Sequence, residues 1–342
     1  MATTPARTMA AAVLTALPAD GLEVRQVPVP RPTRDDDVVL RVEACGICGT
    51  DLHILDGQSY RPELPFVLGH EPVGVVVDAG AAAQEWLDRR VTLTLFTGDG
   101  TCPACLAGDE RLCPRLRSIT GVLAVDGAYA EYVRVHARQL VAVPEGLGAE
   151  HAASLVDAGA TAANSVRVAC EAQTGNVLVI GAGPIGWLVA ELLRHDRVAH
   201  VVVEPNGLRR VALANAGHDV VSSFDEVAGA VDAVIDCSGA AAAMAPAIEL
   251  LGPHGRYVLA GYARVPDFDF GEVSHREIAI LGVRSGRRDD LERILALAAA
   301  GLIVLPELST WPLDRIDDAL RALRSGAVAG KAVIIPDPLW KE

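Results

Sequence analysis

The sequence lacks any run of 18 consecutive apolar residues, which excludes a conventional membrane-spanning helix. It also lacks a basic excess, because 30 lysine and arginine residues stand against 44 aspartate and glutamate residues, for a formal net charge of −14. A nucleic acid or an anionic membrane surface would repel such a chain, so a small molecule is the expected partner. Met1–Arg7 has no cationic start followed by an apolar stretch, so we expect a cytoplasmic protein.

Aromatic residues are scarce, at 4% of the 342 residues, whereas hydrophobic residues as a whole reach 51%. A composition that draws its apolar residues from Ala, Val and Leu is typical of α/β proteins with buried parallel strands, and it argues against disorder. No internal repeat is visible. The chain is too long for one hydrophobic core, which predicts two domains.

The hydrophobic pattern changes near Glu150. Before this point, short runs rich in β-branched residues predict a β-rich half; examples are residues 38–42, 73–77 and 90–95. Beyond it, apolar runs alternate with helical stretches, which predicts a parallel doubly wound sheet. The expected strands are 176–180, 200–204, 231–235, 256–260 and 277–281, and the expected helices between them are 187–193, 209–214 and 240–250.

The C-terminal part carries two amphipathic helical patterns, near 291–297 and 316–323, and a final strand at 331–335. We expect this part to return to the first domain. The predicted domains are therefore 1–155, which is the first part of a β-rich domain, 156–289, which holds the doubly wound sheet, and 290–342, which completes the β-rich domain.

A glycine motif lies between the strand 176–180 and the helix that follows it. Gly181, Gly183 and Gly186 form a Gly-x-Gly-x-x-Gly pattern that includes Pro184 and Ile185. An acid, Glu204, follows Gly186 by 18 residues, at the end of the next expected strand. In this context the motif predicts a dinucleotide site, in which the glycines admit the pyrophosphate and Glu204 holds the ribose hydroxyls. Arg209, with Arg210, is close enough in sequence to offer partial compensation to the extra phosphate of NADP.

The stretch from Cys45 to Glu71 concentrates metal-binding and proton-transferring side chains between glycines. The residues of interest in it are Cys45, Cys48, Thr50, Asp51, His53, His70 and Glu71, which supply thiols, a hydroxyl, carboxylates and imidazoles. These are the groups needed for a zinc site with a proton relay. Taken alone, the two cysteines could equally be buried apolar thiols.

Two motifs in this stretch resemble those of the zinc-containing medium-chain alcohol dehydrogenases. Gly69-His70-Glu71-Pro72-Val73-Gly74, with Gly80 after five more residues, looks like the signature of that family, and residues 48–53 resemble its first zinc-ligand segment. The similarity extends from about residue 9 to about residue 336. It implies a GroES-like catalytic domain followed by a Rossmann domain, with zinc and NAD as cofactors, an alcohol or ketone as substrate, and a homodimer or homotetramer.

The resemblance implies zinc ligands at Cys48 and His70 but not at Cys45. Asp157 falls where the family carries Cys, Glu or Asp, and we favour it as the third ligand over an ordinary acid at a helix start. Glu71 corresponds to a carboxylate that lies beside the metal more often than it binds it. Asp51 is expected to orient a ligand imidazole.

In the resembled family, a hydroxyl at the position of Thr50 takes the proton of the alcohol and passes it through the nicotinamide ribose to a histidine at the position of His53. A histidine suits this role because its pKa allows proton exchange with solvent near neutral pH. A surface histidine without a catalytic role is the alternative for His53.

Seven cysteines is an odd number, and three of them follow a Cys-x-x-Cys…Cys spacing at Cys102, Cys105 and Cys113. This grouping favours metal over disulfides and implies a reducing compartment. It resembles the structural zinc lobe of the family, which normally has four cysteines. The position of the missing cysteine is Asp99. Either Asp99 completes a second zinc site, which we favour, or the lobe is metal-free. Cys170 and Cys237 are expected in the core.

Two other classes of protein share this fold. A zinc-free NADPH-dependent quinone or enone reductase would need no ligand triad, and Cys48, His70 and Asp157 argue against it. A nucleotide-binding homologue without catalysis would not need Thr50 and His53. The sequence therefore favours a zinc-dependent oxidoreductase that transfers a hydride between NAD(P) and an alcohol, with a secondary alcohol or a polyol as the expected substrate class.

Overall fold

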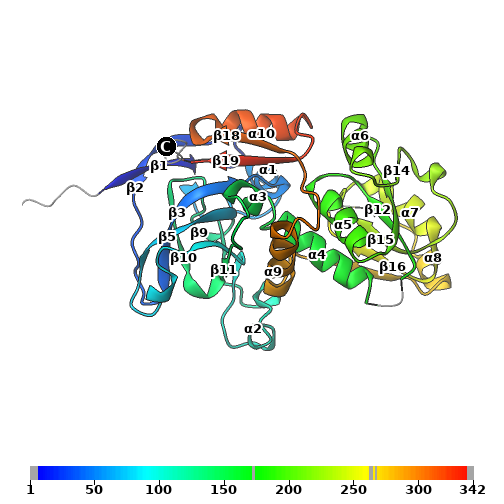
Figure 1. Ribbon diagram of the computed structural model, residues 1–342, viewed down its shortest axis with the longest axis horizontal. Helices are drawn as coiled ribbons and strands as arrows, with labels where there is room; N and C mark the ends of the chain where they lie inside the picture. Colours follow the sequence, from blue (N-terminus) through cyan, green and yellow to red (C-terminus); the bar gives the residue numbers. More distant parts are fainter. Residues whose placement is uncertain (1–6, 172–173, 262–264, 266–267, 337–342) are drawn as a thin grey trace, which may run out of the picture. The chain divides into compact units, whose positions relative to one another are not determined.

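The computed structural model describes residues 7–171, 174–261, 265 and 268–336, so that all of the lead Met1–Arg7 except Arg7 lies outside the described residues. The chain divides into two compact units (Figure 1), residues 1–157 with 308–342, and residues 158–307. Across the described part of the chain, no helix combines the length and the apolar character that crossing a bilayer requires.

The first unit is built mainly of strands. Their bounds are β1 (Thr8–Leu14), β2 (Glu23–Pro28), β3 (Asp37–Gly46), β4 (Phe66–Val67), β5 (Glu71–Ala79), β6 (Arg90–Leu93), β7 (Phe96–Thr97), β8 (Ser118–Thr120), β9 (Ala124–Val125), β10 (Tyr132–His136), β11 (Leu140–Ala142), β18 (Leu308–Pro312) and β19 (Lys331–Ile335). The main sheet has the order β11-β6-β5-β3-β19-β18, with β10 also paired to β3. Two smaller sheets have the orders β2-β1-β4 and β7-β8-β9.

Strand β3 is the centre of this unit, because nine of its ten residues are buried. It runs antiparallel to β5, with Gly46 opposite Glu71, and antiparallel to β19, with Gly46 opposite Val333. The end of β3 thus lies between the start of β5 and the C-terminal strand. These are the segments that surround the candidate metal ligands.

Short helices connect the strands of the first unit: α1 (Gly49–Leu55), α2 (Pro103–Leu106), α3 (Ala149–Ala153) and α10 (Ile316–Arg324), with 3-10 turns η1 (Gln84–Trp86), η2 (Glu110–Leu112), η3 (Ala137–Gln139) and η6 (Leu313–Arg315). The helix α1 directly follows Cys48, the first candidate ligand. An ion pair between Arg324 and Asp56, 2.8 Å apart, joins α10 to the end of α1. The sequence motifs gave no separate prediction for α1.

The second unit contains a parallel sheet, as the alternation of strands and helices predicts. Its elements are α4 (Ala158–Ala169), β12 (Asn176–Ile180), α5 (Pro184–His195), β13 (Ala199–Val203), α6 (Gly207–Asn215), β14 (Val220–Val221), β15 (Val231–Asp236), α7 (Met244–Leu250), β16 (Leu251–Leu259), α8 (Gly271–His275), β17 (Ala279–Gly282) and α9 (Arg288–Ala299), with 3-10 turns η4 (Phe224–Glu226) and η5 (Ala241–Ala243). The strand order is β14-β13-β12-β15-β16-β17, with every pair parallel. This is the Rossmann order, whose ligand crevice lies where the order of the strands reverses, between β12 and β15.

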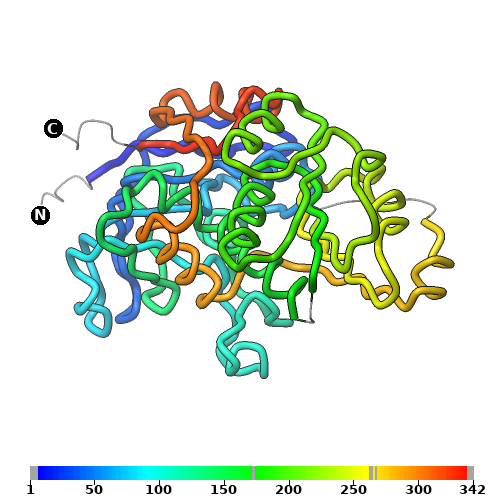
Figure 2. Tube along the Cα trace, turned by 45° about the vertical axis from the view of Figure 1, so that its right-hand side comes forward, coloured from blue at the N-terminus to red at the C-terminus, as the bar shows by residue number. Residues whose placement is uncertain are grey.

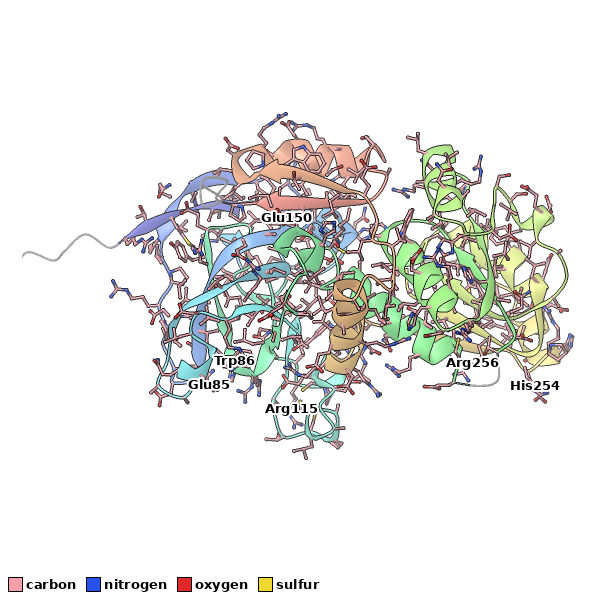
Figure 3. All side chains as sticks on the ribbon, viewed as in Figure 1. Glu85, Trp86, Arg115, Glu150, His254 and Arg256 are labelled. Carbon is pink, nitrogen blue, oxygen red and sulfur yellow. The ribbon has the colours of Figure 1, made fainter. Side chains whose placement is uncertain are left out.

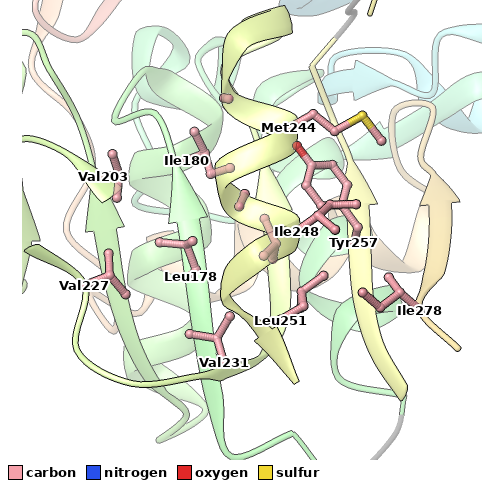
Figure 4. Packing of buried hydrophobic residues seen from close by; sticks show 13 residues of the cluster. Leu178, Ile180, Val203, Val227, Val231, Met244, Ile248, Leu251, Tyr257 and Ile278 are labelled. Atoms are coloured by element: carbon pink, nitrogen blue, oxygen red, sulfur yellow. The ribbon is translucent and has the colours of Figure 1, made fainter. Parts of the chain in front are cut away.

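Buried side chains of the sheet and of α7 form one hydrophobic cluster in this unit (Figure 4). Leu178 and Ile180 of β12 belong to it, together with Ile248 of α7 and Tyr257 of β16. Because apolar positions on a buried strand need not alternate, the runs 176–180 and 231–235 could be recognised from composition. The trace in Figure 2 follows this alternation of strand and helix through the unit.

The division of the structure differs from the predicted boundaries at one helix. The unit boundaries fall after residues 157 and 307, so that α9 belongs to the second unit. There α9 packs against α4, and Arg167 of α4 pairs with Asp290 of α9 at 3.1 Å. The amphipathic pattern of α9 predicted a helix correctly, but such a pattern does not specify which core the helix covers. From β18 onward the chain does belong to the first unit.

Candidate metal and cofactor sites

Cys48 lies in the turn between β3 and α1. Its backbone is extended, and it is the N-cap residue of α1. The carboxylate of Asp51, on the first turn of α1, accepts a hydrogen bond from the backbone N–H of Cys48 at 2.9 Å. This reciprocal capping fixes the backbone that carries the Cys48 thiol.

His70 lies directly before β5, and its side chain is almost fully buried. The preceding residue, Gly69, has a φ of +101°, and a Cβ there would lie 2.6 Å from the backbone nitrogen of Tyr129. Only glycine allows this approach. Neither ring nitrogen of His70 has a hydrogen-bond partner among the residues described. The nearest groups are the carboxylates of Asp51 and Asp157, at 3.4 and 3.7 Å, and a buried ring nitrogen that makes no hydrogen bond is open to a ligand.

Asp157 brings the third donor from a distant part of the sequence, directly before α4. Its Oδ2 atom lies 3.7 Å from Nε2 of His70 and 3.7 Å from Sγ of Cys48. Zinc bonds of 2.0–2.3 Å in a tetrahedral arrangement separate ligand atoms by roughly 3.3–3.8 Å. Both separations from Asp157 therefore fall within the range that a shared zinc ion requires. The ligand atoms of this group, including one from Glu71, all lie within 4.8 Å of one another.

Glu71 also contacts a buried lysine. Nζ of Lys331, on β19, lies 2.6 and 2.8 Å from the two carboxylate oxygens of Glu71, and both side chains are nearly inaccessible. Burial acts to lower the pKa of Lys331, but the Glu71 carboxylate raises it to about 12. A Cβ on Gly46 would lie 2.3 Å from Glu71, which explains the glycine at that position. Both carboxylate oxygens of Glu71 thus have a cationic partner other than a metal.

The remaining residues of the first motif lie on or next to α1. Oγ1 of Thr50 lies 3.7 Å from Sγ of Cys48. His53 is one turn further along the same helix and is half-buried. Cys45 is fully buried on β3 and lies outside the group of candidate ligands, and burial raises the pKa of its thiol.

The predicted glycine motif connects β12 to α5 as a tight turn. Gly181 has a φ of +90°, and Gly183 caps α5, whose first residues are Pro184 and Ile185. A Cβ on Gly186 would lie 1.8 Å from the carbonyl oxygen of Gly181, whereas a Cβ on Gly183 would meet no atom within 4 Å. The turn therefore needs Gly186 for packing and leaves open space at Gly183. Such a turn before a helix N-terminus suits a pyrophosphate.

Glu204 lies directly after β13 and is 4% exposed. Its two carboxylate oxygens accept hydrogen bonds from the backbone N–H groups of Ala182 and Asn206, at 2.7 and 2.8 Å. The acid is thereby tied to the glycine turn, as a ribose-binding acid should be. The guanidinium of Arg210 donates to the carbonyl oxygens of Glu204 and Pro205, while Nε of Arg209 has no hydrogen-bond partner in the described structure.

Comparison with known proteins identifies the family to which the chain belongs. The profile of the alcohol dehydrogenase GroES-like domain matches residues 34–145, and the profile of the zinc-binding dehydrogenase domain matches residues 211–334. An alcohol dehydrogenase of Geobacillus stearothermophilus is 30% identical over 333 residues, which cover 92% of this chain and 96% of that protein. The chain belongs to the zinc-containing medium-chain alcohol dehydrogenases.

Two solved structures support this assignment. The cobalt- and zinc-bound thermostable alcohol dehydrogenase from Pyrobaculum aerophilum has a TM-score of 0.87 at 29% identity and covers 96% of this chain and 100% of its own. The acetophenone reductase from Geotrichum candidum, in complex with NAD, has a TM-score of 0.87 at 26% identity and covers 98% of both chains. The predicted family and fold class are confirmed, and so, at the level of the family, is an oxidoreductase acting on alcohols with zinc and NAD as cofactors.

In this dehydrogenase, a second group of possible metal ligands lies on the lobe between β7 and β8. The ligand atoms of Asp99, Cys102, Cys105 and Cys113 lie within 4.8 Å of one another. Backbone N–H groups point at two of the sulfurs, from Asp99 to Cys113 at 3.3 Å and from Cys105 to Cys102 at 3.4 Å. A Cβ on Gly98 would lie 2.4 Å from Sγ of Cys105, so glycine is required beside the cluster.

Asp99 has competing partners within the lobe. Its Oδ1 atom accepts hydrogen bonds from the N–H groups of Thr101 and Cys102, and its Oδ2 atom lies 2.5 Å from the guanidinium of Arg115. Figure 3 labels Arg115 on this lobe. These backbone hydrogen bonds lower the pKa of Asp99, and Arg115 adds to the effect. The carboxylate is therefore charged and fixed next to the three thiols.

Sequence reasoning did not identify two buried residues beside the first metal group. One is Lys331, and the other is Tyr129, whose hydroxyl donates a hydrogen bond to Oδ2 of Asp51 at 2.8 Å. Burial, followed by the charge of Asp51, raises the pKa of Tyr129, so the hydroxyl keeps its proton and acts as the donor. Neither residue carries a local signal, because each lies within an apolar strand-like run far from the motif that it contacts.

Proposed function

We propose that this dehydrogenase interconverts a secondary alcohol and its ketone with NAD, holding a catalytic zinc on Cys48, His70 and Asp157. The observation that carries the proposal is the convergence of a thiol and a buried imidazole on one carboxylate oxygen, Oδ2 of Asp157, which lies 3.7 Å from Sγ of Cys48 and 3.7 Å from Nε2 of His70. Three protein ligands leave one tetrahedral position open, which distinguishes a catalytic zinc from a structural one.

When bound, zinc polarises the oxygen of the alcohol and makes its hydroxyl more acidic, and NAD accepts the hydride from carbon. The chain must then supply a path for the hydroxyl proton. Thr50 is the candidate first acceptor, because its hydroxyl lies 3.7 Å from the thiol of a proposed ligand. His53, one turn further on α1, is the candidate exchange point with solvent. Both residues are partly accessible, as a proton path to water requires.

Asp51 and Glu71 support the metal ligands from outside the triad. Oδ1 of Asp51 lies 3.4 Å from Nδ1 of His70, which leaves Nε2 facing Asp157. This arrangement selects the tautomer that can bind metal through Nε2. Glu71 lies beside the site with both carboxylate oxygens held by Lys331.

The glycine turn and Glu204 favour NAD as the cofactor. A carboxylate that accepts from ribose hydroxyls meets a phosphate of like charge in NADP. Arg209 is the residue best able to offset that repulsion, since Arg210 is engaged with backbone carbonyls. We therefore propose a preference for NAD over NADP in which Arg209 permits some use of NADP.

Four finer assignments are part of the proposal. The substrate class is proposed to be a secondary alcohol, and the acetophenone reductase, named for a ketone substrate, supports this choice. A homodimer or homotetramer is proposed, together with a cytoplasmic location, where seven unpaired cysteines would remain reduced. The lobe of Asp99, Cys102, Cys105 and Cys113 is proposed to hold a second, structural zinc.

The function is tested with a panel of primary alcohols, secondary alcohols, polyols and ketones, by following nicotinamide absorbance with NAD and with NADP. We expect turnover of secondary alcohols or ketones with NAD. Thr50→Val should keep zinc while lowering kcat by roughly 10²-fold or more, the size of a lost proton-transfer group. Thr97→Val, on β7, is the matched control. Near-normal kcat in Thr50→Val would remove Thr50 from the relay, and no turnover of any panel member would contradict the proposed substrate class.

A further inference from the structure

Tyr129 is among the largest fully buried side chains of the protein. Its hydroxyl lies 2.8 Å from Oδ2 of Asp51 and 3.3 Å from the carbonyl oxygen of Gly46. A hydroxyl has one proton to donate, and the shorter contact is to the charged acceptor. Tyr129 thus places a single polar atom at the buried side of the proposed zinc site.

The backbone of Tyr129 is fixed to the segment that carries His70. Its N–H donates to the carbonyl oxygen of Leu68 at 3.0 Å. The N–H of the neighbouring Ala128 donates to the carbonyl oxygen of Gly69 at 2.8 Å. Its own carbonyl oxygen accepts from the N–H of Ala12 at 2.8 Å. The ring therefore extends from a position anchored beside His70, and its orientation does not depend on a flexible loop.

Asp51, which is inaccessible to solvent, connects three parts of the site. Its Oδ2 atom accepts from the hydroxyl of Tyr129 and from the backbone N–H of Cys48. Its Oδ1 atom faces Nδ1 of His70 at 3.4 Å. If the Tyr129 hydroxyl were absent, one of the donors that hold this carboxylate in place would be lost. Its rotation would alter both the Cys48 turn and the orientation of the His70 ring.

We propose that Tyr129 is a positioning residue for the catalytic metal: its hydroxyl holds the Asp51 carboxylate in the orientation that presents Cys48 and His70 to zinc. The inference rests on the proposed zinc ligands and adds a residue to them. Partners that orient metal ligands typically change metal affinity by 10–100-fold when they are removed. The hydroxyl carries this role, and the ring fills the space around it.

The test is the variant Tyr129→Phe, which keeps the ring and removes the hydroxyl. Zinc affinity is measured by competition with a chromophoric chelator, and the ligand geometry is measured from the visible spectrum of the cobalt-substituted protein. We expect the affinity for zinc to fall by about tenfold or more at the site of Cys48, His70 and Asp157. The visible spectrum of the cobalt-substituted protein should shift as well. Cys48→Ala identifies which zinc ion belongs to this site.

Tyr257→Phe is the matched control. Tyr257 is also fully buried, and its hydroxyl also donates to a buried carboxylate, that of Asp236, at 2.8 Å, but in the second unit. It should lose stability to a similar extent with no change in zinc affinity or cobalt spectrum. Unchanged affinity and an unchanged spectrum in Tyr129→Phe would overturn the inference, as would equal losses in both variants. If Cys48→Ala instead contained as much zinc as the wild type, the proposed function itself would be contradicted.

Discussion

Lys331 and Glu71 are 260 residues apart in sequence, yet they form a buried ion pair next to the proposed zinc ligands, with their charged atoms 2.6 and 2.8 Å apart. The pair joins the C-terminal strand β19 to the first residue of β5. It explains why the C-terminal segment completes the first unit.

Lys331→Met should destabilise the protein by about 3–5 kcal/mol, because it leaves Glu71 charged and buried without its partner. The double variant Lys331→Met with Glu71→Gln should recover much of this loss. Chemical denaturation of the two single variants and the double variant gives the coupling between the residues. Additive losses would show that the two side chains do not depend on each other.

A second buried acid lies in the Rossmann unit. Glu191 of α5 is inaccessible, and it contacts His218 at 2.7 Å and accepts from the N–H of Val304 at 2.7 Å. Burial acts to raise the pKa of Glu191, but these two contacts, with Arg194, lower it overall. A lowered pKa means that this stabilisation is present above the ordinary value of 4.5 and is lost as the pH falls through the lowered value.

Glu191→Gln should therefore cost about 2 kcal/mol near neutral pH, the size of a charged hydrogen bond. The difference from the wild type should shrink as the pH falls below 4.5. Denaturation midpoints measured across this range test the prediction, with the exposed acid change Glu171→Gln as the control. A difference that does not vary with pH would show that the charge of Glu191 is unimportant.

Cofactor choice tests the role of Glu204. The wild type should use NAD more efficiently than NADP, and Glu204→Gln should narrow the ratio of the two kcat/KM values by roughly tenfold or more, as expected for a lost charged contact. The glutamine keeps the size of the side chain and one acceptor oxygen, which can accept from the N–H of Ala182 in the glycine turn, but it loses the hydrogen bond from Asn206. Equal efficiencies in the wild type, or a ratio unaffected by the substitution, would remove Glu204 from its role. Glu171→Gln again serves as the control.

The lobe is predicted to hold one zinc in addition to the catalytic one. Elemental analysis of protein purified without chelators should give two zinc ions per chain, and Asp99→Asn should lower this number to one, because a neutral amide is a weaker ligand than a carboxylate. Arg115→Gln should keep both ions, since it only frees an oxygen of Asp99. One zinc in the wild type, or two in Asp99→Asn, would show that Asp99 is not a ligand.

The sequence could predict the parts of the site whose signals are local. The turn from β12 to α5 was predictable because Gly181, Gly183 and Gly186 lie within six residues and their spacing has a physical meaning. Cys48 and His70 belong to short motifs, but it was the resemblance of these motifs to a family that predicted them as ligands. Asp157 required the resemblance to a family, since its distance from the other ligands in sequence gives no signal.

The sequence could not predict contacts that depend on tertiary packing. Tyr129 reaches Asp51 across 78 residues, and Lys331 reaches Glu71 across 260. Both lie in strand-like runs where a tyrosine or a lysine is an ordinary residue. The assignment of α9 to the wrong domain has a similar origin, because its apolar stripe could cover either core. Its packing on α4 depends on the complete fold.

The most direct test of the account is the zinc content and turnover of Cys48→Ala. If Cys48, His70 and Asp157 hold the catalytic zinc, the variant should contain one zinc fewer per chain than the wild type and lose turnover with every alcohol. It should still bind NAD with unchanged affinity in a fluorescence titration, because Gly181–Gly186 and Glu204 belong to the other unit. A variant that kept the full zinc content and near-normal turnover would contradict the proposed metal site.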